Sequence, residues 1–225
     1  MDRPAGPRTL VVVGCIVAAC VVAGVLAAGW DGPAVQDLRV YRDAAQRVLD
    51  GLPLYPPGSQ YFGDQPLPFT YPPFAALVLL PATLIPLGSA VAVWWLLSFL
   101  CLWWLSYRSF AQLLAPLGTL GRWAGSLVLA VAALLALDPL IRHFAFGQVG
   151  LFLAVLCLLD LDLGVRRSRA AGVLVGLAAA IKLSPGAFVL TYVAARRWRA
   201  VATVVVTTAG CWLLAALVLP SATRD

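Results

Sequence analysis

The chain has 225 residues, of which 62% are hydrophobic and only 12% are charged, whereas soluble domains average roughly 45–50% apolar and about 25% charged residues. Apolar stretches close to the ~20 residues that cross a bilayer recur along the whole sequence, which excludes an ordinary soluble domain. The net charge of +6 comes mainly from arginines clustered between these stretches. This pattern indicates membrane topology and not nucleic-acid binding.

The apolar segments follow one another from the N-terminus onward. The first, 10–29, predicts a retained membrane span because it is longer than the ~7–15-residue core of a secretory signal. The others are 71–87, 89–107, 123–140, 149–165, 170–195 and 201–219. We therefore predict an all-α polytopic membrane protein, with residues 1–225 forming a single transmembrane domain.

Residues 36–51 predict an amphipathic helix on the outer membrane surface. Leu38, Tyr41 and Ala45 recur at helical spacing, while charged residues occupy the opposite side. Asp37 stands where an N-cap is expected and Gly51 where a helix C′ residue is expected. Asp37 thus has two open interpretations, a helix cap or a functional carboxylate.

Two apolar segments are not expected to be simple spans. Segment 71–87 carries four prolines, which remove backbone donors and break helices, so we predict a re-entrant or juxtamembrane helix on the outer side. Segment 170–195 lies between two arginine clusters that should both be cytoplasmic. It is therefore expected to run outward, break at Lys182-Leu-Ser-Pro, and return.

The resulting topology has about seven crossings and places every arginine cluster in the cytoplasm. The polar segments then gather on the outer side: the first outer loop 31–70, the segment 138–148 and the break at Lys182. This one-sided gathering favours a functional site at the outer interface. The odd number of crossings leads us to expect a chain that is incomplete at its C-terminus.

Five ordered elements carry a resemblance to a known family. They are Asp37–Ala44, Gly51–Tyr55, Tyr71–Pro73, Gly147-Gln148 and Lys182–Pro185. Taken together they resemble the family 87 glycosyltransferases, the polyprenyl-phosphate-mannose-dependent mannosyltransferases of actinobacterial envelope biosynthesis. The resemblance implies a GT-C architecture and an active site on the periplasmic face of the plasma membrane. It also implies a catalytic aspartate in the first outer loop, a role that maps onto Asp37, with Asp31 as the fallback.

A glycosyl phosphate already carries a good leaving group, so one base that deprotonates the acceptor hydroxyl suffices for an inverting displacement. Lys182, the only lysine, and Arg142 and His143 are candidates for contacts with the donor phosphate. Candidate substrate-binding residues are Tyr41, Tyr55, Tyr71, Gln148 and Ser184. The expected partners are the lipid-linked sugar donor, membrane lipid and a lipid or glycan acceptor.

No cofactor, metal or disulfide is expected. The one Asp-x-Asp pair, Asp160 and Asp162, lies at a cytoplasmic end, where we predict ion pairing with the neighbouring arginines. Two alternatives to a transferase stay open: a transporter or flippase for polyprenyl-linked sugar or lipid, and an inactive fragment of the transferase. A broken helix with a lone lysine also suits a transporter, but the polar positions gather on one side and no inverted repeat is visible.

Overall fold

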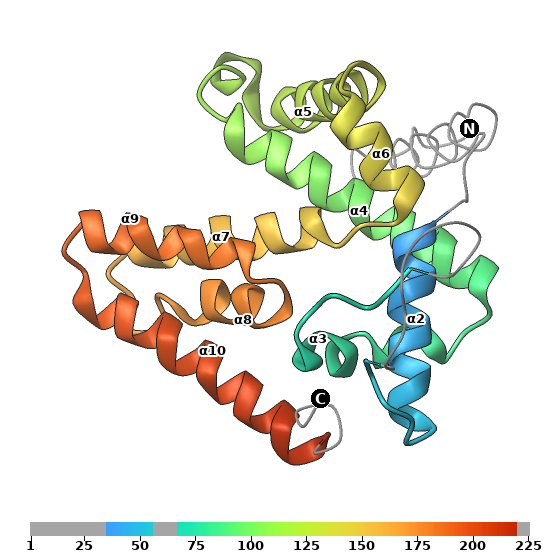
Figure 1. Cartoon of the computed structure of the whole chain (residues 1–225). Coiled ribbons are helices and arrows are strands. Elements are labelled where there is room, and N and C mark those ends of the chain that lie inside the picture. Colours follow the sequence, from blue (N-terminus) through green and yellow to red (C-terminus); the bar gives the residue numbers. More distant parts are fainter. Residues whose placement is uncertain (1–34, 56–66, 220–225) are drawn as a thin grey trace, which may run out of the picture. The chain divides into compact units, whose positions relative to one another are not determined.

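The computed structural model describes residues 35–55 and 67–219, and all regular structure in these ranges is helical (Figure 1). This confirms the all-α prediction for the described residues. Within them, Leu87–Ser109, Ala115–Ala136 and Trp198–Val218 are long and apolar enough to cross a membrane, and a bent helix pair can count as a fourth span. The chain is therefore a polytopic membrane protein, while the seven crossings stay a prediction. The predicted first span, 10–29, and Asp31 lie outside the described residues.

The helices form two compact units. In the first, α4 (Leu87–Ser109, from Val91 onward) packs with α5 (Gly118–Ala136) and α6 (Asp138–Phe146). A short 3-10 turn, η2 (Ala115–Leu117), precedes α5. The core of this unit consists of Phe99, Leu102, Trp103, Ala130, Leu134, Phe144 and Leu151. The indoles of Trp94 and Trp95 donate hydrogen bonds to the carbonyls of Gln148 (3.2 Å) and Phe144 (2.9 Å), which ties α4 to the end of α6.

The second unit contains the remaining helices. They are α2 (Gln36–Leu49), α3 (Pro73–Val78), α7 (Gly150–Val165), α8 (Val173–Ile181), α9 (Val189–Ala194) and α10 (Trp198–Val218), with the 3-10 turns η1 (Leu80–Thr83) and η3 (Ser184–Phe188).

Helix α2 has the predicted amphipathic pattern, but protein covers its apolar side. Leu38, Tyr41, Ala44 and Ala45 are at most 1% exposed, so this side cannot rest on lipid as we expected for a helix lying on the membrane. Gly51 ends the helix as predicted. It has φ +66°, and the amides of Gly51 and Leu52 donate to the carbonyls of Val48 and Arg47, which is the Schellman pattern.

The prolines were predicted to interrupt the helix in segment 71–87, and the structure confirms that this segment is not a continuous helix. It forms α3, of six residues, and η1, of four, and both are too short to cross a bilayer. Pro86 has no amide to offer the carbonyl of Ala82, and the guanidinium of Arg42 donates to that carbonyl instead. The same side chain also bonds the carbonyl of Ile85 at 2.9 Å. A charged residue of α2 thus satisfies backbone acceptors next to Pro86.

The predicted break at Lys182 is confirmed. Helix α8 ends at Ile181, Lys182 is extended (φ −144°, ψ 131°), and the chain then enters η3. A Cβ placed on Gly186 would lie 3.6 Å from the Cβ of Ala179, so the chain folds back onto α8 after the break. Pro185 favours this turn because it cannot donate to the carbonyl of Ile181.

Helix α10 packs closely along α8. A Cβ on Gly176 would lie 2.7 Å from the Cβ of Thr207, so only glycine allows this approach. Gly172 and Gly176 form a small-x-x-x-small pair of the kind that brings membrane helices together. Thr208 and Trp212 of α10 donate to the carbonyls of Gly176 (3.0 Å) and Ala180 (3.3 Å). Helix α8 is thereby held along its whole length.

Asp160 anchors the start of α8. Its carboxylate is fully buried and accepts hydrogen bonds from the backbone amides of Gly172 (2.7 Å), Leu174 (2.6 Å) and Val175 (3.1 Å). The hydroxyl of Tyr192 donates to the same side chain. The expected pairing of Asp160 with the neighbouring arginines is therefore wrong, because amides left unpaired at a helix start take up its oxygens.

Replacing Asp160 by Ala should strongly destabilise the protein. Three amides and one hydroxyl would lose their acceptor in a buried place, and a single unsatisfied buried group costs about 1–3 kcal/mol. We expect a loss of at least about 3 kcal/mol, measured as the change in unfolding free energy in detergent micelles. Asp43→Ala is the control, because Asp43 is exposed on α2. Equal stability of the two variants would show that the Asp160 contacts contribute nothing.

Candidate functional site

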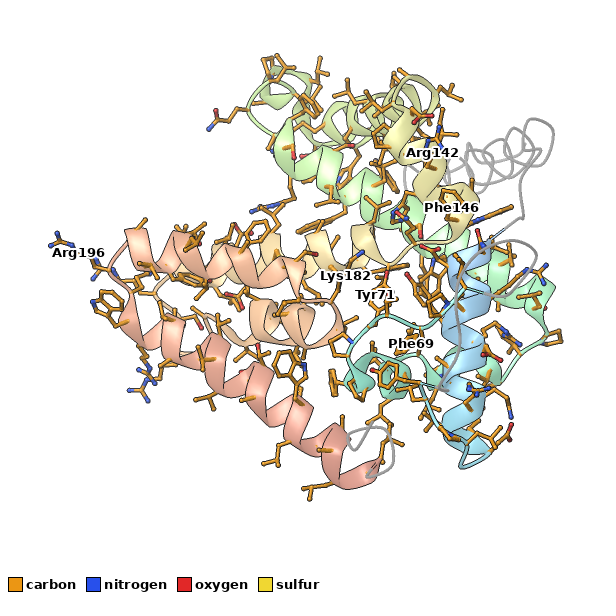
Figure 2. The ribbon with its side chains drawn as sticks, viewed as in Figure 1. Phe69, Tyr71, Arg142, Phe146, Lys182 and Arg196 are labelled. Carbon is orange, nitrogen blue, oxygen red and sulfur yellow. The ribbon has the colours of Figure 1, made fainter. Side chains whose placement is uncertain are left out.

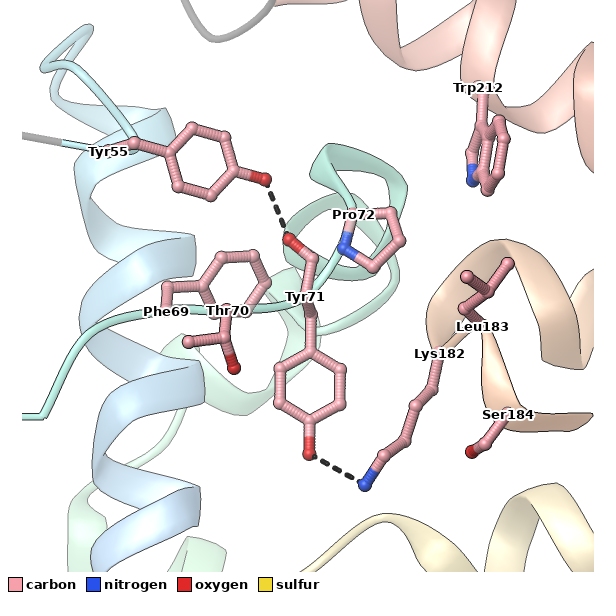
Figure 3. Close-up of a pocket in the computed structure, with 9 residues that line it drawn as sticks. All are labelled: Tyr55, Phe69, Thr70, Tyr71, Pro72, Lys182, Leu183, Ser184 and Trp212. Carbon is pink, nitrogen blue, oxygen red and sulfur yellow. Dashed lines mark hydrogen bonds between the residues drawn. The ribbon is translucent and has the colours of Figure 1, made fainter. Parts of the chain in front are cut away.

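A pocket of about 740 Å³ lies within the second unit (Figure 3). This volume falls in the range of roughly 300–1,000 Å³ that is usual for ligand sites. Its walls come from Tyr55 in the loop after α2, the segment 69–72 that leads into α3, the break after α8, and α10. The lining residues are Tyr55, Phe69, Thr70, Tyr71, Pro72, Lys182, Leu183, Ser184 and Trp212.

Lys182 is the only charged residue among these nine. Because α8 ends one residue earlier and Lys182 is extended, its side chain leaves the helix and points toward Tyr71 (Figures 2 and 3). The ammonium donates to the Tyr71 hydroxyl at 3.3 Å and lies 5.2 Å from the ring centroid. An ammonium is a compact charge that suits a phosphate oxygen. The pocket therefore presents one cation in an aromatic surrounding.

The tyrosines that the sequence singled out meet around Tyr71. Its hydroxyl lies 2.9 Å from that of Tyr41, and the two rings meet edge to face at 5.2 Å. Tyr55 donates to the backbone carbonyl of Tyr71 at 2.6 Å, and burial raises the pKa of Tyr55 to about 12, so this hydroxyl stays protonated at neutral pH. Phe69 stacks on Tyr55, with ring centroids 6.3 Å apart. Rings with polar rims of this kind offer both flat apolar faces and hydroxyls to a ligand.

Asp37 lies in the first turn of α2, four residues before Tyr41. Residues at this spacing are neighbours on one helix face, with Cβ atoms about 5–6 Å apart. The carboxylate thus belongs to the face that carries the Tyr41–Tyr71–Lys182 hydrogen-bond series. Asp37 is not the N-cap, since the helix begins at Gln36 and the preceding residue, Val35, has φ +52°. An acid in the first turn interacts favourably with the helix dipole instead.

The other predicted site residues belong to the first unit. Arg142 is paired with Asp138 (2.6 Å), the i to i+4 pair that the sequence suggested, and both side chains are exposed. His143 is buried next to Gly150. Gly147 (φ +69°) and Gln148 end α6, and the amide of Gln148 donates to the carbonyl of His143. The Gly-Gln element is thus a helix C-terminal motif, and a role of Arg142, His143 or Gln148 in substrate binding stays a prediction.

Five lining residues were not predicted as site residues. Pro72 and Leu183 belong to the two motifs that the sequence singled out, whereas Phe69, Thr70 and Trp212 lie outside them. Phe69 and Thr70 directly precede the Tyr71 motif, which was a usable signal. Trp212 stands in an apolar span, where nothing distinguishes it from a tryptophan that faces lipid. Within the ranges that the structure describes, no group of three or more His, Cys, Asp or Glu residues could hold a metal ion.

The profile of glycosyltransferase family 87 matches residues 69–225, which include both the Tyr71 motif and the Lys182 break. The chain belongs to glycosyltransferase family 87. Helix α2 with Asp37 precedes the matched residues of this family 87 chain. No solved structure matches it, so the GT-C architecture stays a prediction.

Three curated relatives are similar to this family 87 chain. A polyprenol-phosphate-mannose-dependent alpha-(1-2)-phosphatidylinositol pentamannoside mannosyltransferase of Mycolicibacterium smegmatis is 40% identical over 181 residues, which cover 76% of this chain and 40% of the relative. The Mycobacterium tuberculosis protein of the same description is 33% identical over 179 residues, 76% of this chain and 39% of that relative. A second M. smegmatis protein, described as a phosphatidylinositol mannoside mannosyltransferase, is 33% identical over 193 residues, 77% and 42% of the two chains. The chain thus spans about two-fifths of the length of the relatives it matches.

Proposed function

We propose that this family 87 chain carries the donor site and the catalytic base of a mannosyltransferase that uses polyprenol-phosphate mannose and a lipid or glycan acceptor. The observation that carries the proposal is Lys182, the only charge among the nine lining residues of an aromatic pocket. A sugar phosphate is bound well by a site that places a cation next to the phosphate and aromatic rings and hydroxyl groups next to the sugar. The names of the curated relatives support the choice of donor.

In the proposed reaction, the acceptor hydroxyl oxygen forms a bond to the anomeric carbon of the sugar from the face opposite the phosphate. The bond between the anomeric carbon and the phosphate oxygen breaks, and its electron pair leaves with polyprenyl phosphate. Lys182 stabilises the negative charge of the departing phosphate. Asp37 accepts the proton of the acceptor hydroxyl, a contribution of typically ~10²–10⁴-fold. Ser184 and the pocket tyrosines hold sugar hydroxyls, and the reaction needs no metal.

The direct test is a transfer assay in membranes that contain the whole protein and labelled polyprenol-phosphate mannose. We expect label to appear in an acceptor glycolipid and unlabelled polyprenyl phosphate to be released. Movement of intact labelled donor across the bilayer without product would instead establish a transporter. Donor binding with neither product nor movement would point to the inactive-fragment alternative.

We further propose that the pocket faces the outer side of the plasma membrane. Single cysteines at Asp50 and Arg142 should react with a membrane-impermeant thiol reagent from outside, whereas cysteines at Arg167 and Arg197 should react only after the membrane is opened. These expectations follow from the positive-inside rule. A cysteine at Arg108 distinguishes the topologies: labelling from outside would mean that segment 71–87 crosses the bilayer and is not re-entrant.

A further inference from the structure

Two arginine-bearing turns meet at one end of the second unit, opposite to the Lys182 end of α8. The first joins α7 to α8 and the second joins α9 to α10. The guanidinium of Arg197 in the second turn donates to the carbonyl of Gly164, at the end of α7 where the first turn begins. Gly164 also packs on the ring of Tyr192, where an added Cβ would lie 2.7 Å from the ring. The two turns therefore form one surface, which we call the basic surface. Its arginines are Arg166, Arg167, Arg169, Arg196, Arg197 and Arg199.

Both turns use the same unusual backbone. Arg167 (φ +55°) and Arg196 (φ +54°) each occupy the left-handed position just past a helix end. Their amides donate to the carbonyls of Gly164 and Val193, and the next amide in each turn donates one residue further back, which makes two Schellman motifs. Glycine is the residue that suits this position, because a Cβ is disfavoured there. Two arginines occupy backbone positions that are strained for any residue except glycine. This points to a functional role for the two arginine side chains.

Positive-inside topology does not account for this choice. The rule counts arginines near the ends of spans and is indifferent to their place within the turn. Residues 160–199 contain six arginines but only two aspartates. One of these, Asp160, is fully buried and holds the start of α8. All the arginines of the basic surface except Arg197 are exposed, so the surface is strongly cationic.

Apolar side chains are exposed among these charges. Val165 is 78% exposed and Trp198 63% exposed. Trp198 is also the first residue of α10, one of the helices able to span the membrane. The basic surface therefore lies where an apolar span begins, at the depth of the lipid headgroups. Tryptophan is favoured at this depth, and arginine forks there match phosphate oxygens.

We propose that the basic surface binds the phosphate headgroups of anionic phospholipids in the adjacent leaflet. Arg167 and Arg196 contact headgroup phosphates, while Trp198 and Val165 enter the acyl boundary. Juxtamembrane arginine clusters are attracted to anionic lipid in this way, and salt weakens the attraction. This proposal does not depend on the mannosyltransferase assignment, because the surface shares no residue with the Lys182 pocket.

The test uses the full chain in nanodiscs of phosphatidylcholine with increasing fractions of phosphatidylglycerol, and it records the thermal unfolding midpoint. For the unchanged chain the midpoint should rise with the anionic fraction, because a lipid that binds the folded state stabilises it. Arg167→Gly/Arg196→Gly should unfold at the same or a higher temperature in pure phosphatidylcholine, since glycine relieves the left-handed positions. Its response to phosphatidylglycerol should weaken, with an apparent affinity lower by on the order of 10-fold.

Further variants separate charge from backbone. Arg167→Lys/Arg196→Lys keeps both charges and should keep most of the lipid response. Arg166→Gln/Arg199→Gln removes two charges without touching the left-handed positions and should reduce the response as the glycine pair does. Each pair of substitutions leaves four arginines to hold the topology. The proposal is overturned if phosphatidylglycerol leaves the midpoint of the unchanged chain where it was, or raises the midpoint of either charge-removing variant as much as it raises that of the unchanged chain.

Discussion

Replacing Asp37 by Asn should lower mannose transfer by about 10²–10⁴-fold while the protein stays folded and still binds donor. Asparagine has nearly the same shape as aspartate but cannot accept the proton of the acceptor hydroxyl. The substitution removes an acid from the first turn of α2, and the lost interaction with the helix dipole costs about 0.3–1 kcal/mol. The measurement is the initial rate of label transfer from polyprenol-phosphate mannose in membranes, with donor saturation checked separately.

Asp43→Asn is the matched control, because Asp43 lies on the same helix but is exposed. It should keep near-normal transfer. If Asp37→Asn and Asp43→Asn both transfer normally, Asp37 is not the base and Asp31 is the next residue to test. A fall in transfer accompanied by loss of folded protein would instead assign Asp37 a structural role within α2.

Local chemistry made part of this structure predictable. Gly51 ends α2 because a left-handed residue is needed there, and the sequence shows that glycine directly. The prolines of segment 71–87 and Pro185 interrupt helices at positions that can be read without any tertiary information. Tyr71, Lys182 and Ser184 line one pocket because the two broken segments that carry them pack in the same unit, and Tyr55 reaches this pocket from the loop after α2.

Tertiary contacts decided what the sequence could not reveal. Asp160 followed by arginines looks like an ion pair, but the carboxylate reaches the amides of Gly172 and Leu174, twelve and fourteen residues away. No local sequence pattern predicts a contact over this separation in the chain. The apolar side of α2 has the same composition whether lipid or protein covers it, and only the buried Tyr41 and its bond to Tyr71 settle the matter for this chain. Arg42 likewise looks like a solvated surface charge until its two carbonyl partners are seen.

Replacing Lys182 by Met should weaken donor binding by roughly 10–100-fold, since a hydrogen bond to a charged group contributes about 1.5–3 kcal/mol. Methionine keeps much of the length and apolar stem of lysine, so the chain should still fold and insert into the membrane. The lost contact is the one to the donor phosphate. The measurement is the donor concentration that half-saturates transfer, or direct binding of polyprenol-phosphate mannose to the purified protein.

Two companion variants show whether charge or position matters. Lys182→Arg keeps the positive charge at the break after α8 and should bind donor much better than Lys182→Met. Tyr71→Phe removes the hydroxyl that accepts from Lys182 at 3.3 Å but leaves the ammonium in the pocket. Its effect on donor binding should be smaller than that of Lys182→Met, because the phosphate contact survives while its orientation relaxes. Unchanged donor affinity in Lys182→Met would leave this lysine with a structural role only, a side chain that reaches from a helix end toward the membrane surface. The donor phosphate would then have to be held by other residues, with Arg142 the first to test.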